Sequence, residues 1–202
     1  IAGLRKATSG NVFVNGQATT NKPPSALNAI GLSYIPEERM IDGVIKEFTV
    51  AENLVLQDHG HRKYTWNKIF MNFRKINEAC RAAIKAYEIK TPSTDTPIKN
   101  LSGGNIQKLV LARELSRNPS VLIAAQPTRG VDIGASEYIH QRLLEERNNG
   151  TAIILISEDL DEIRALSDRI LVMYEGKIVG EVENKGIDIE QIGLLMTGSS
   201  QV

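Results

Sequence analysis

Long apolar runs, paired cysteines and an excess of charge are all lacking from this sequence of 202 residues. Its longest apolar runs, such as Val121 to Ala125, are far shorter than the roughly 20 residues that cross a bilayer. The single cysteine, Cys80, excludes an intramolecular disulfide and favours a reducing compartment. Lysine plus arginine equal aspartate plus glutamate at 24 each, so bulk positive charge for nucleic-acid binding is absent.

What is present is typical of a soluble globular protein, with 42% hydrophobic and 24% charged residues. After residue 100, apolar strands at Val121 to Ala125 and Thr151 to Ser157 alternate with expected helices at Asn105 to Arg117 and about 134 to 148. This alternation indicates βαβ units and a parallel sheet covered on both faces by helices. The sequence therefore predicts an α/β fold.

The first half carries weaker signals. Leu32 to Ile35 predicts a short strand, and Thr49 with Glu52 forms a capping-box pattern that opens a helix to about Gln57. Residues 58 to 71 are read as irregular and Thr91 to Asn100 as a loop. Between them lies a helix whose apolar residues recur at helical spacing on one face, namely Phe73, Ile76, Cys80, Ile84 and Tyr87. Cys80 is expected to be a buried structural thiol.

A small-residue loop, Leu101-Ser102-Gly103-Gly104-Asn105, leads directly into a helix. A helix start carries unpaired amides and partial positive charge, and glycines let a polyphosphate approach the backbone. Ser102 adds a hydroxyl donor. Alone this loop is a weak signal, because two glycines before a helix are more often a simple turn.

The string from Leu101 to Lys108 resembles the signature motif of ATP-binding-cassette (ABC) ATPases. Several other blocks follow the family's order and spacing, from the first residue to about Val182. Val121 to Asp132 is similar to the Walker B strand and D-loop, and Ile154 to Glu162 to the switch segment. The remaining blocks are a Q-loop at Tyr34 to Glu37, Thr49 to Leu54, and a closing hairpin at Asp168 to Ile178. The nearest subgroup is the C-terminal cassette of two-cassette importers for simple sugars and nucleosides.

The resemblance implies a P-loop NTPase-like cassette with a parallel core sheet flanked by helices. It divides the chain into a partial ATP-binding core with the Q-loop (1–48), a helical subdomain that ends in the signature loop (49–104), and the remainder of the core (105–202).

Four positions depart from a hydrolysing cassette of this family. The Mg²⁺-holding aspartate and the catalytic glutamate of Walker B are replaced by Ala125 and Gln126. The switch histidine is replaced by Glu158 and the Q-loop glutamine by Glu37. A methyl group binds no cation and a neutral amide accepts no proton from water, so we expect no catalytic residues and no metal ligands in this chain.

A Walker A loop is also absent, because the only Gly-Lys pair, Gly176-Lys177, lies in an expected hairpin. The chain opens at Ile1, and its start is similar to the segment that follows the P-loop in the family. We therefore expect a degenerate cassette cut before or within Walker A, which lacks the P-loop strand and is inactive alone.

The intact elements are Ser102, Gly103, Gly104, Asn105 and the D-loop residue Asp132. Because cassettes of the family dimerise head to tail, the resemblance implies that these residues contact ATP held with Mg²⁺ by another cassette of the same or a parent chain. It also implies a membrane permease as partner, indirectly a solute-binding protein, and a cytoplasmic location at the inner face of the cell membrane. Whether this chain binds ATP alone stays open, as does the transported solute.

Several other motifs are interpreted as surface features rather than as catalytic or metal sites. His59 and His61 are expected in a surface loop rather than a metal site, and His140 on a solvated helix face. The acidic clusters Glu145 to Arg147 and Asp159 to Glu162 are also read as solvated faces. The charged loop Pro36 to Glu47 is expected to contact a partner, because the Q-loop region of the family touches the membrane subunit.

Two rival functions remain. One is a non-hydrolysing structural or regulatory module with the cassette fold, against which the intact signature loop argues. The other is a soluble ABC ATPase of translation or DNA repair. Members of that group generally keep both Walker B acids and often carry coiled-coil or basic insertions, which are absent here.

Overall fold

The computed structural model describes residues 1–67, 69–184 and 189–198 of the chain. These residues form two compact units, Ile1–Ile156 and Ser157–Val202. The three-part division expected from the sequence is based on the roles of the segments in the family, whereas the two units are defined by their internal packing. The three-part division stays a prediction.

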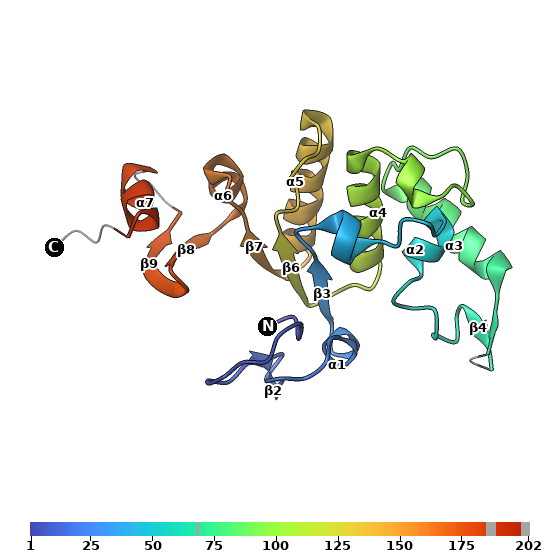
Figure 1. Ribbon diagram of the computed structural model, residues 1–202, viewed down its shortest axis with the longest axis horizontal. Coiled ribbons are helices and arrows are strands. Elements are labelled where there is room, and N and C mark those ends of the chain that lie inside the picture. Colours follow the sequence, from blue (N-terminus) through green and yellow to red (C-terminus); the bar gives the residue numbers. More distant parts are fainter. Residues whose placement is uncertain (68, 185–188, 199–202) are drawn as a thin grey trace. The chain divides into compact units, whose positions relative to one another are not determined.

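The centre of the first unit is a parallel three-stranded sheet in the order β3-β6-β7. Its strands are β3 (Leu32–Ile35), β6 (Val121–Ala125) and β7 (Ala152–Ile156). The helices α4 (Gly103–Leu115) and α5 (Ile133–Asn148) contact each other, and they also contact β3 and β7 respectively (Figure 1). The predicted α/β class is confirmed.

Burial differs along the sheet. In β6, Leu122 and Ala124 are fully buried, as expected for a central parallel strand. In β7 exposure alternates, and Ile154 and Ile156 are 40% and 51% exposed. The predicted parallel sheet flanked by helices is confirmed, and within the first unit one face of β7 is less covered than the other.

The remaining elements of the first unit are short, apart from α3. A capping box at Thr49 and Glu52 opens α2, as predicted, although α2 ends at Leu54 rather than near Gln57. Residues 58–71, read as irregular, contain a small antiparallel hairpin. These elements are β1 (Phe13–Val14), β2 (Gln17–Ala18), α1 (Pro24–Ala29), the π-helical turn η1 (Arg39–Gly43), α2 (Val50–Leu54), β4 (Thr65–Trp66), β5 (Phe70–Met71), α3 (Phe73–Ala86) and the 3₁₀ turn η2 (Ile98–Asn100).

Helix α3 buries Ile76 and Cys80, and burial raises the pKa of the Cys80 thiol to about 12. The reading of Cys80 as a buried structural thiol is confirmed. Phe73, expected on the same apolar face, is instead 61% exposed at the first position of the helix.

The second unit packs a helix pair on a long hairpin. Its buried core consists of Ile170, Val172 and Ile192. The elements are α6 (Leu160–Leu166), β8 (Arg169–Tyr174), β9 (Lys177–Glu183) and α7 (Ile189–Met196). Glu162, expected on a solvated face, is only 2% exposed, so that prediction is wrong for this residue.

Candidate functional site

The start of helix α4 presents the residues of the signature-like loop. Ser102 is the N-cap, and the first intrahelical bond runs from the Ile106 amide to the Ser102 carbonyl at 3.0 Å. The amides of Gly103, Gly104 and Asn105 thus lie in the first turn, outside the i to i−4 pattern and at the positive end of the helix dipole. This end of α4 is suited to an anion.

Asn105 fixes the Ser102 hydroxyl. Its Oδ1 accepts a hydrogen bond of 2.7 Å from the Lys90 amide, so its Nδ2 is the atom that donates to Ser102 Oγ at 2.8 Å. Because Ser102 Oγ is the acceptor in that bond, its own proton is available to a further acceptor. Ser102 is exposed, and the hydroxyl is therefore held in position at the surface.

The two glycines have a packing reason that the sequence did not reveal. A Cβ on Gly104 would lie 2.9 Å from the Ala135 Cβ and 3.2 Å from Asp132 Oδ2. A Cβ on Gly103 would lie 2.7 Å from Arg39 Nη2. Glycine therefore lets the start of α4 approach both the start of α5 and the arginine after β3.

Asp132 caps helix α5, because its Oδ1 accepts a hydrogen bond of 2.9 Å from the Ala135 amide. The Gly104 geometry places the other carboxylate oxygen beside the start of α4. The structure thus brings Asp132 together with the loop Ser102 to Asn105, from sequence positions about thirty residues apart.

Two arginines that the sequence analysis assigned no role connect this region. Arg39 donates to the carbonyl oxygens of Arg129 and Gly130, the second at 2.9 Å. Arg129 donates to the Glu37 carboxylate and forms an ion pair of 3.3 Å with Glu38. Burial lowers the pKa of the Arg39 guanidinium. Arg39 and Arg129 were visible in the Pro-Glu-Glu-Arg and Pro-Thr-Arg-Gly strings, but nothing local indicated their partners.

Farther along α4, Arg113 and Glu114 form a buried ion pair of 2.9 Å. Arg113 Nη1 also donates to the Gly43 carbonyl at 2.8 Å, and Gln57 donates to Glu114 at 2.9 Å. These bonds anchor the C-terminal end of α4 to the η1 turn and to the segment after α2.

The four altered positions lie at carboxyl ends of strands or beyond them. Ala125 is buried at the end of β6. Gln126 follows β6 with a left-handed backbone conformation, φ 48°. Its backbone N–H donates a hydrogen bond of 2.7 Å to the Ile156 carbonyl oxygen. Glu37 is paired with Arg129. Glu158 is exposed and belongs to the second unit.

These residues do not fit Mg²⁺, since the end of β6 offers no carboxylate and the Glu37 carboxylate is held by Arg129. No group of three or more histidine, cysteine, aspartate or glutamate side chains suited to a metal occurs in the described ranges. His59 and His61 are both exposed, which confirms their surface position.

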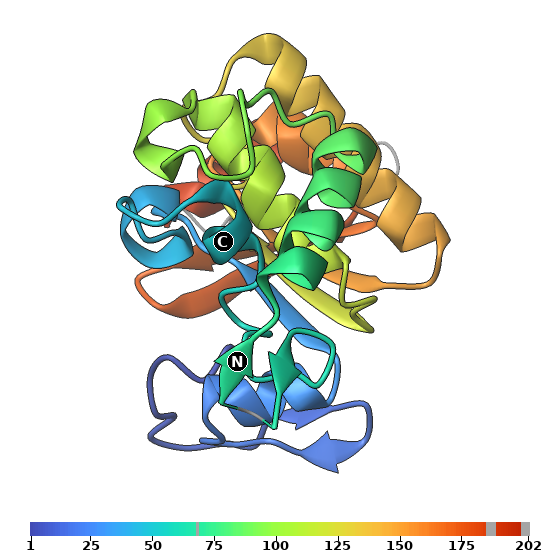
Figure 2. The same cartoon turned by 90° about the vertical axis from the view of Figure 1, so that its right-hand side faces the viewer.

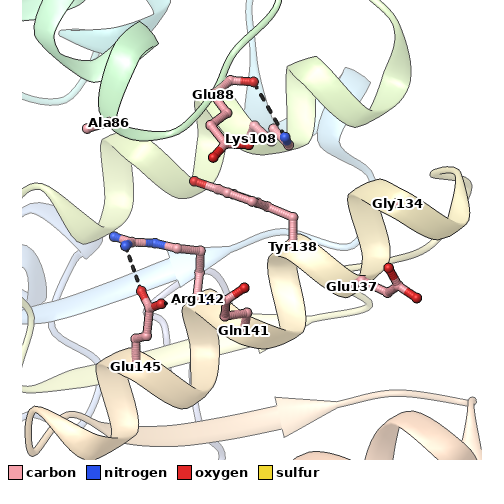
Figure 3. Close-up of a pocket in the computed structure, with 9 residues that line it drawn as sticks. All are labelled: Ala86, Glu88, Lys108, Gly134, Glu137, Tyr138, Gln141, Arg142 and Glu145. Atoms are coloured by element: carbon pink, nitrogen blue, oxygen red, sulfur yellow. Dashed lines mark hydrogen bonds and ion pairs between the residues drawn. The ribbon is translucent and has the colours of Figure 1, made fainter.

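A separate cavity of about 410 Å³ lies between the end of α3, α4 and α5 (Figure 3). Lys108 Nζ stacks over the Tyr138 ring at 4.0 Å, and Arg142 pairs with Glu145 at 2.7 Å. Because both cations are engaged and three carboxylates (Glu88, Glu137 and Glu145) line the cavity, it does not suit a polyphosphate.

Together, the parallel sheet, the signature-like loop at the start of α4 and Asp132 at the adjoining start of α5 are the arrangement of an ATP-binding cassette. The ABC transporter family profile matches residues 1–129, and the chain belongs to this family. Cassettes of the family bind ATP, typically with Mg²⁺.

Curated relatives match almost the whole chain. The guanosine import ATP-binding protein NupO of Bacillus subtilis is 40% identical over 201 residues, which are 100% of this chain and 39% of NupO. The glucose import ATP-binding protein TsgD13 of Haloferax volcanii is 42% identical over 200 residues, which are 98% of this chain and 36% of TsgD13. The chain thus spans well under half the length of these relatives.

Solved structures agree on the fold. A nucleotide-free ATP-binding cassette from an ABC transporter aligns with a TM-score of 0.72 and 27% identity, covering 98% of this chain and 77% of that one. A dimeric cassette in a post-hydrolysis state bound to ADP and phosphate aligns with a TM-score of 0.74 and 22% identity, covering 93% and 78%. Within the described ranges, none of the helices combines the length and apolar character that crossing a bilayer requires.

Proposed function

We propose that this chain is the signature-bearing, non-hydrolysing cassette of an importer for sugars or nucleosides. The proposal rests on the contrast between the N-terminal end of helix α4 and the C-terminal end of strand β6. The start of α4 is suited to an anion, with Ser102 held by Asn105, whereas β6 ends at Ala125 and is followed by Gln126, so no carboxylate stands there.

In this proposal ATP lies between two cassettes, and its phosphates supply the bond that is hydrolysed. The amides of Gly103 and Gly104 and the Ser102 hydroxyl bind terminal phosphate oxygens. Asp132 keeps the start of α5 in place beside them. Positioning and electrostatic stabilisation account for most of phosphoryl-transfer catalysis, so such contacts act on hydrolysis driven by the opposite cassette.

The ion pair between Glu37 and Arg129 also supports a role for this chain in binding phosphate at a site where the opposite cassette hydrolyses ATP. A free carboxylate near the end of β3 would repel a polyphosphate. Because Arg129 donates to Glu37, part of this negative charge is neutralised. The loops after β3 and β6 thereby act as a scaffold for the signature loop.

The partners that follow from this proposal are a second, hydrolysing cassette, a membrane permease and, through the permease, a solute-binding protein. The location is cytoplasmic, peripheral to the inner face of the cell membrane. Importer names among the relatives, for guanosine and for glucose, support sugars or nucleosides as the solute class.

Two experiments test the proposal. Phosphate release by the purified chain should not exceed background, and the double change Ala125→Asp/Gln126→Glu should not restore it. In cells that carry the full-length protein with its permease, deletion of the gene should abolish uptake of one labelled sugar or nucleoside. Turnover by the purified chain after stringent purification, or unchanged uptake of every sugar and nucleoside tested, would contradict it.

A further inference from the structure

The β4–β5 hairpin and the start of α3 expose four large apolar side chains within a short stretch of sequence. Trp66 is 69% exposed, Phe70 68% and Phe73 61%, and Ile69 in the turn is 75% exposed. Contiguous exposed apolar surface on a soluble domain marks an interaction site or an aggregation hazard. In Figure 1 the hairpin lies beyond α2 and α3, away from the parallel sheet, and Figure 2 turns this end toward the viewer.

The pleat of the hairpin explains which side chains face outward. Trp66 and Phe70 are cross-strand partners and therefore share one face, and Thr65 and Met71 share the other. Thr65 is 8% exposed and Met71 37%, and Met71 lines a small cavity with Ile76, so this second face is the more covered one. The aromatic face is thus the outer face of the hairpin, and it has no packing role within the described part of the chain.

The segment that forms the hairpin carries charge of a single sign, although Glu52 and Asp95 lie beside Met71 and Phe73 on its inner side. Between Asp58 and Glu78 the sequence contains no acidic residue, although the whole chain has no net charge. The same stretch contains five basic residues, and those that the structure describes are exposed. These basic residues are Arg62, Lys63, Lys68, Arg74 and Lys75. Arg74 pairs with Glu78 at 3.1 Å on the surface, where such a pair is weak.

From these observations we propose that the segment from Arg62 to Lys75, which we term the cationic hairpin, contacts an anionic phospholipid surface. Tryptophan and phenylalanine favour the interfacial region of a bilayer, and lysine and arginine bind anionic headgroups. The outer side chains project from a hairpin tip rather than line a groove. A bilayer accepts such a tip without a matching surface, which favours lipid over a protein partner. This inference does not rest on the proposed transport function.

Trp66 is the only tryptophan of the chain, so its fluorescence reports directly on the cationic hairpin. The whole chain is mixed with vesicles of phosphatidylcholine containing about one quarter phosphatidylglycerol. We expect Trp66 emission to shift to shorter wavelength and to be quenched by brominated lipid. The shift should be absent in pure phosphatidylcholine and should be lost at about 0.5 M salt, where surface charge is screened.

Variants separate the apolar and ionic contributions, and flotation of vesicles measures the partition coefficient. Removing two surface cations near an anionic leaflet lowers this coefficient roughly 30-fold, which is the result expected for Arg62→Gln/Lys63→Gln. Phe70→Ala should lower it about tenfold through lost apolar burial. The matched controls Lys85→Gln/Lys99→Gln and Ile41→Ala alter equally exposed residues elsewhere and should change it less than about twofold.

The proposal is overturned if Trp66 emission in anionic vesicles equals that in buffer. It is also overturned if Trp66 becomes protected only by a detergent-solubilised permease, or if the control pairs weaken binding as much as the hairpin variants do. None of these results bears on ATP turnover, so failure of this inference is distinguishable from failure of the proposed function. Since all the altered side chains are exposed, far-ultraviolet circular dichroism should show an unchanged fold.

Discussion

Arg39 donates a hydrogen bond of 2.9 Å to the carbonyl oxygen of Gly130, although the two residues lie 91 positions apart in the chain. The same guanidinium donates to the Arg129 carbonyl and lies against Gly103. One side chain therefore connects the segment after β3, the loop after β6 and the start of α4. These three segments carry the features that define the candidate site.

This connection predicts that Arg39→Lys destabilises the protein although it keeps the charge. A lysine ammonium lacks the planar fork that reaches two carbonyls, and each lost bond to a charged donor costs about 1.5–3 kcal/mol when buried. Because Arg39 is only half-buried, we expect about 1–2 kcal/mol in urea unfolding. The control Arg74→Lys, at a side chain 89% exposed, should change stability by less than about 0.5 kcal/mol. Equal effects of the two changes would refute the connecting role.

The contact between the starts of α4 and α5 predicts different outcomes at two glycines. Gly104→Ala places a Cβ 2.9 Å from the Ala135 Cβ, and such overpacking costs about 1–3 kcal/mol. Gly134→Ala meets only Asp132 Oδ1 at 3.6 Å, an ordinary contact, and should be neutral or stabilising by up to about 1 kcal/mol through helix propensity. Thermal unfolding of both variants checks this, and a destabilised Gly134→Ala beside an unchanged Gly104→Ala would contradict it.

Burial of Cys80 predicts a chemical and a pH effect. Because burial raises the pKa of its thiol to about 12, the thiol stays protonated in the folded state, whereas it ionises near pH 8.5 in the unfolded chain. The folded state therefore loses stability as the pH rises from about 8.5 toward 12. A thiol reagent at pH 8 should modify Cys80 only after unfolding, and Cys80→Ala should lack this alkaline contribution. Rapid labelling of the folded chain would show that the thiol is accessible.

The open face of β7 predicts self-association. Ile154 and Ile156 are exposed, and β6 is the only strand that pairs with β7 among the residues that the structure describes. Exposed apolar side chains on a sheet face favour association, and an unpaired strand edge invites pairing with another chain. We expect light scattering to show dimers or larger species that Ile154→Lys/Ile156→Lys reduces, while Ile41→Lys, also exposed, does not. A monodisperse monomer of the unaltered chain at high concentration would count against this.

Local rules predicted the local features well. The capping box at Thr49 follows from four consecutive residues and is confirmed in full. The helix at the signature loop was predicted to start at Asn105 but starts at Gly103, within the usual uncertainty of helix ends. Features that depend on one chain segment and its immediate neighbours could thus be read from the sequence.

Long-range contacts could not be read in this way. The sequence shows Arg39 and Arg129 but not that their partners lie some ninety residues away. Burial of Glu162 was missed because an acidic cluster at a helix start normally faces water. In each case the position is set by tertiary packing, which periodicity and motif spacing do not encode.

In the proposed function, Ser102 serves the ATP site of an opposite cassette, whereas Gln126 takes no part in hydrolysis. This claim is tested most directly by the ATP turnover of the full-length protein assembled with its permease. Ser102→Arg places a long side chain where phosphate oxygens are expected and removes a hydrogen bond to a charged group, for which the loss is at least about 1.5–3 kcal/mol, or more than tenfold in turnover. Gln126→Ala should leave turnover nearly unchanged. Turnover abolished by Gln126→Ala and preserved in Ser102→Arg would reverse the two roles and contradict the account.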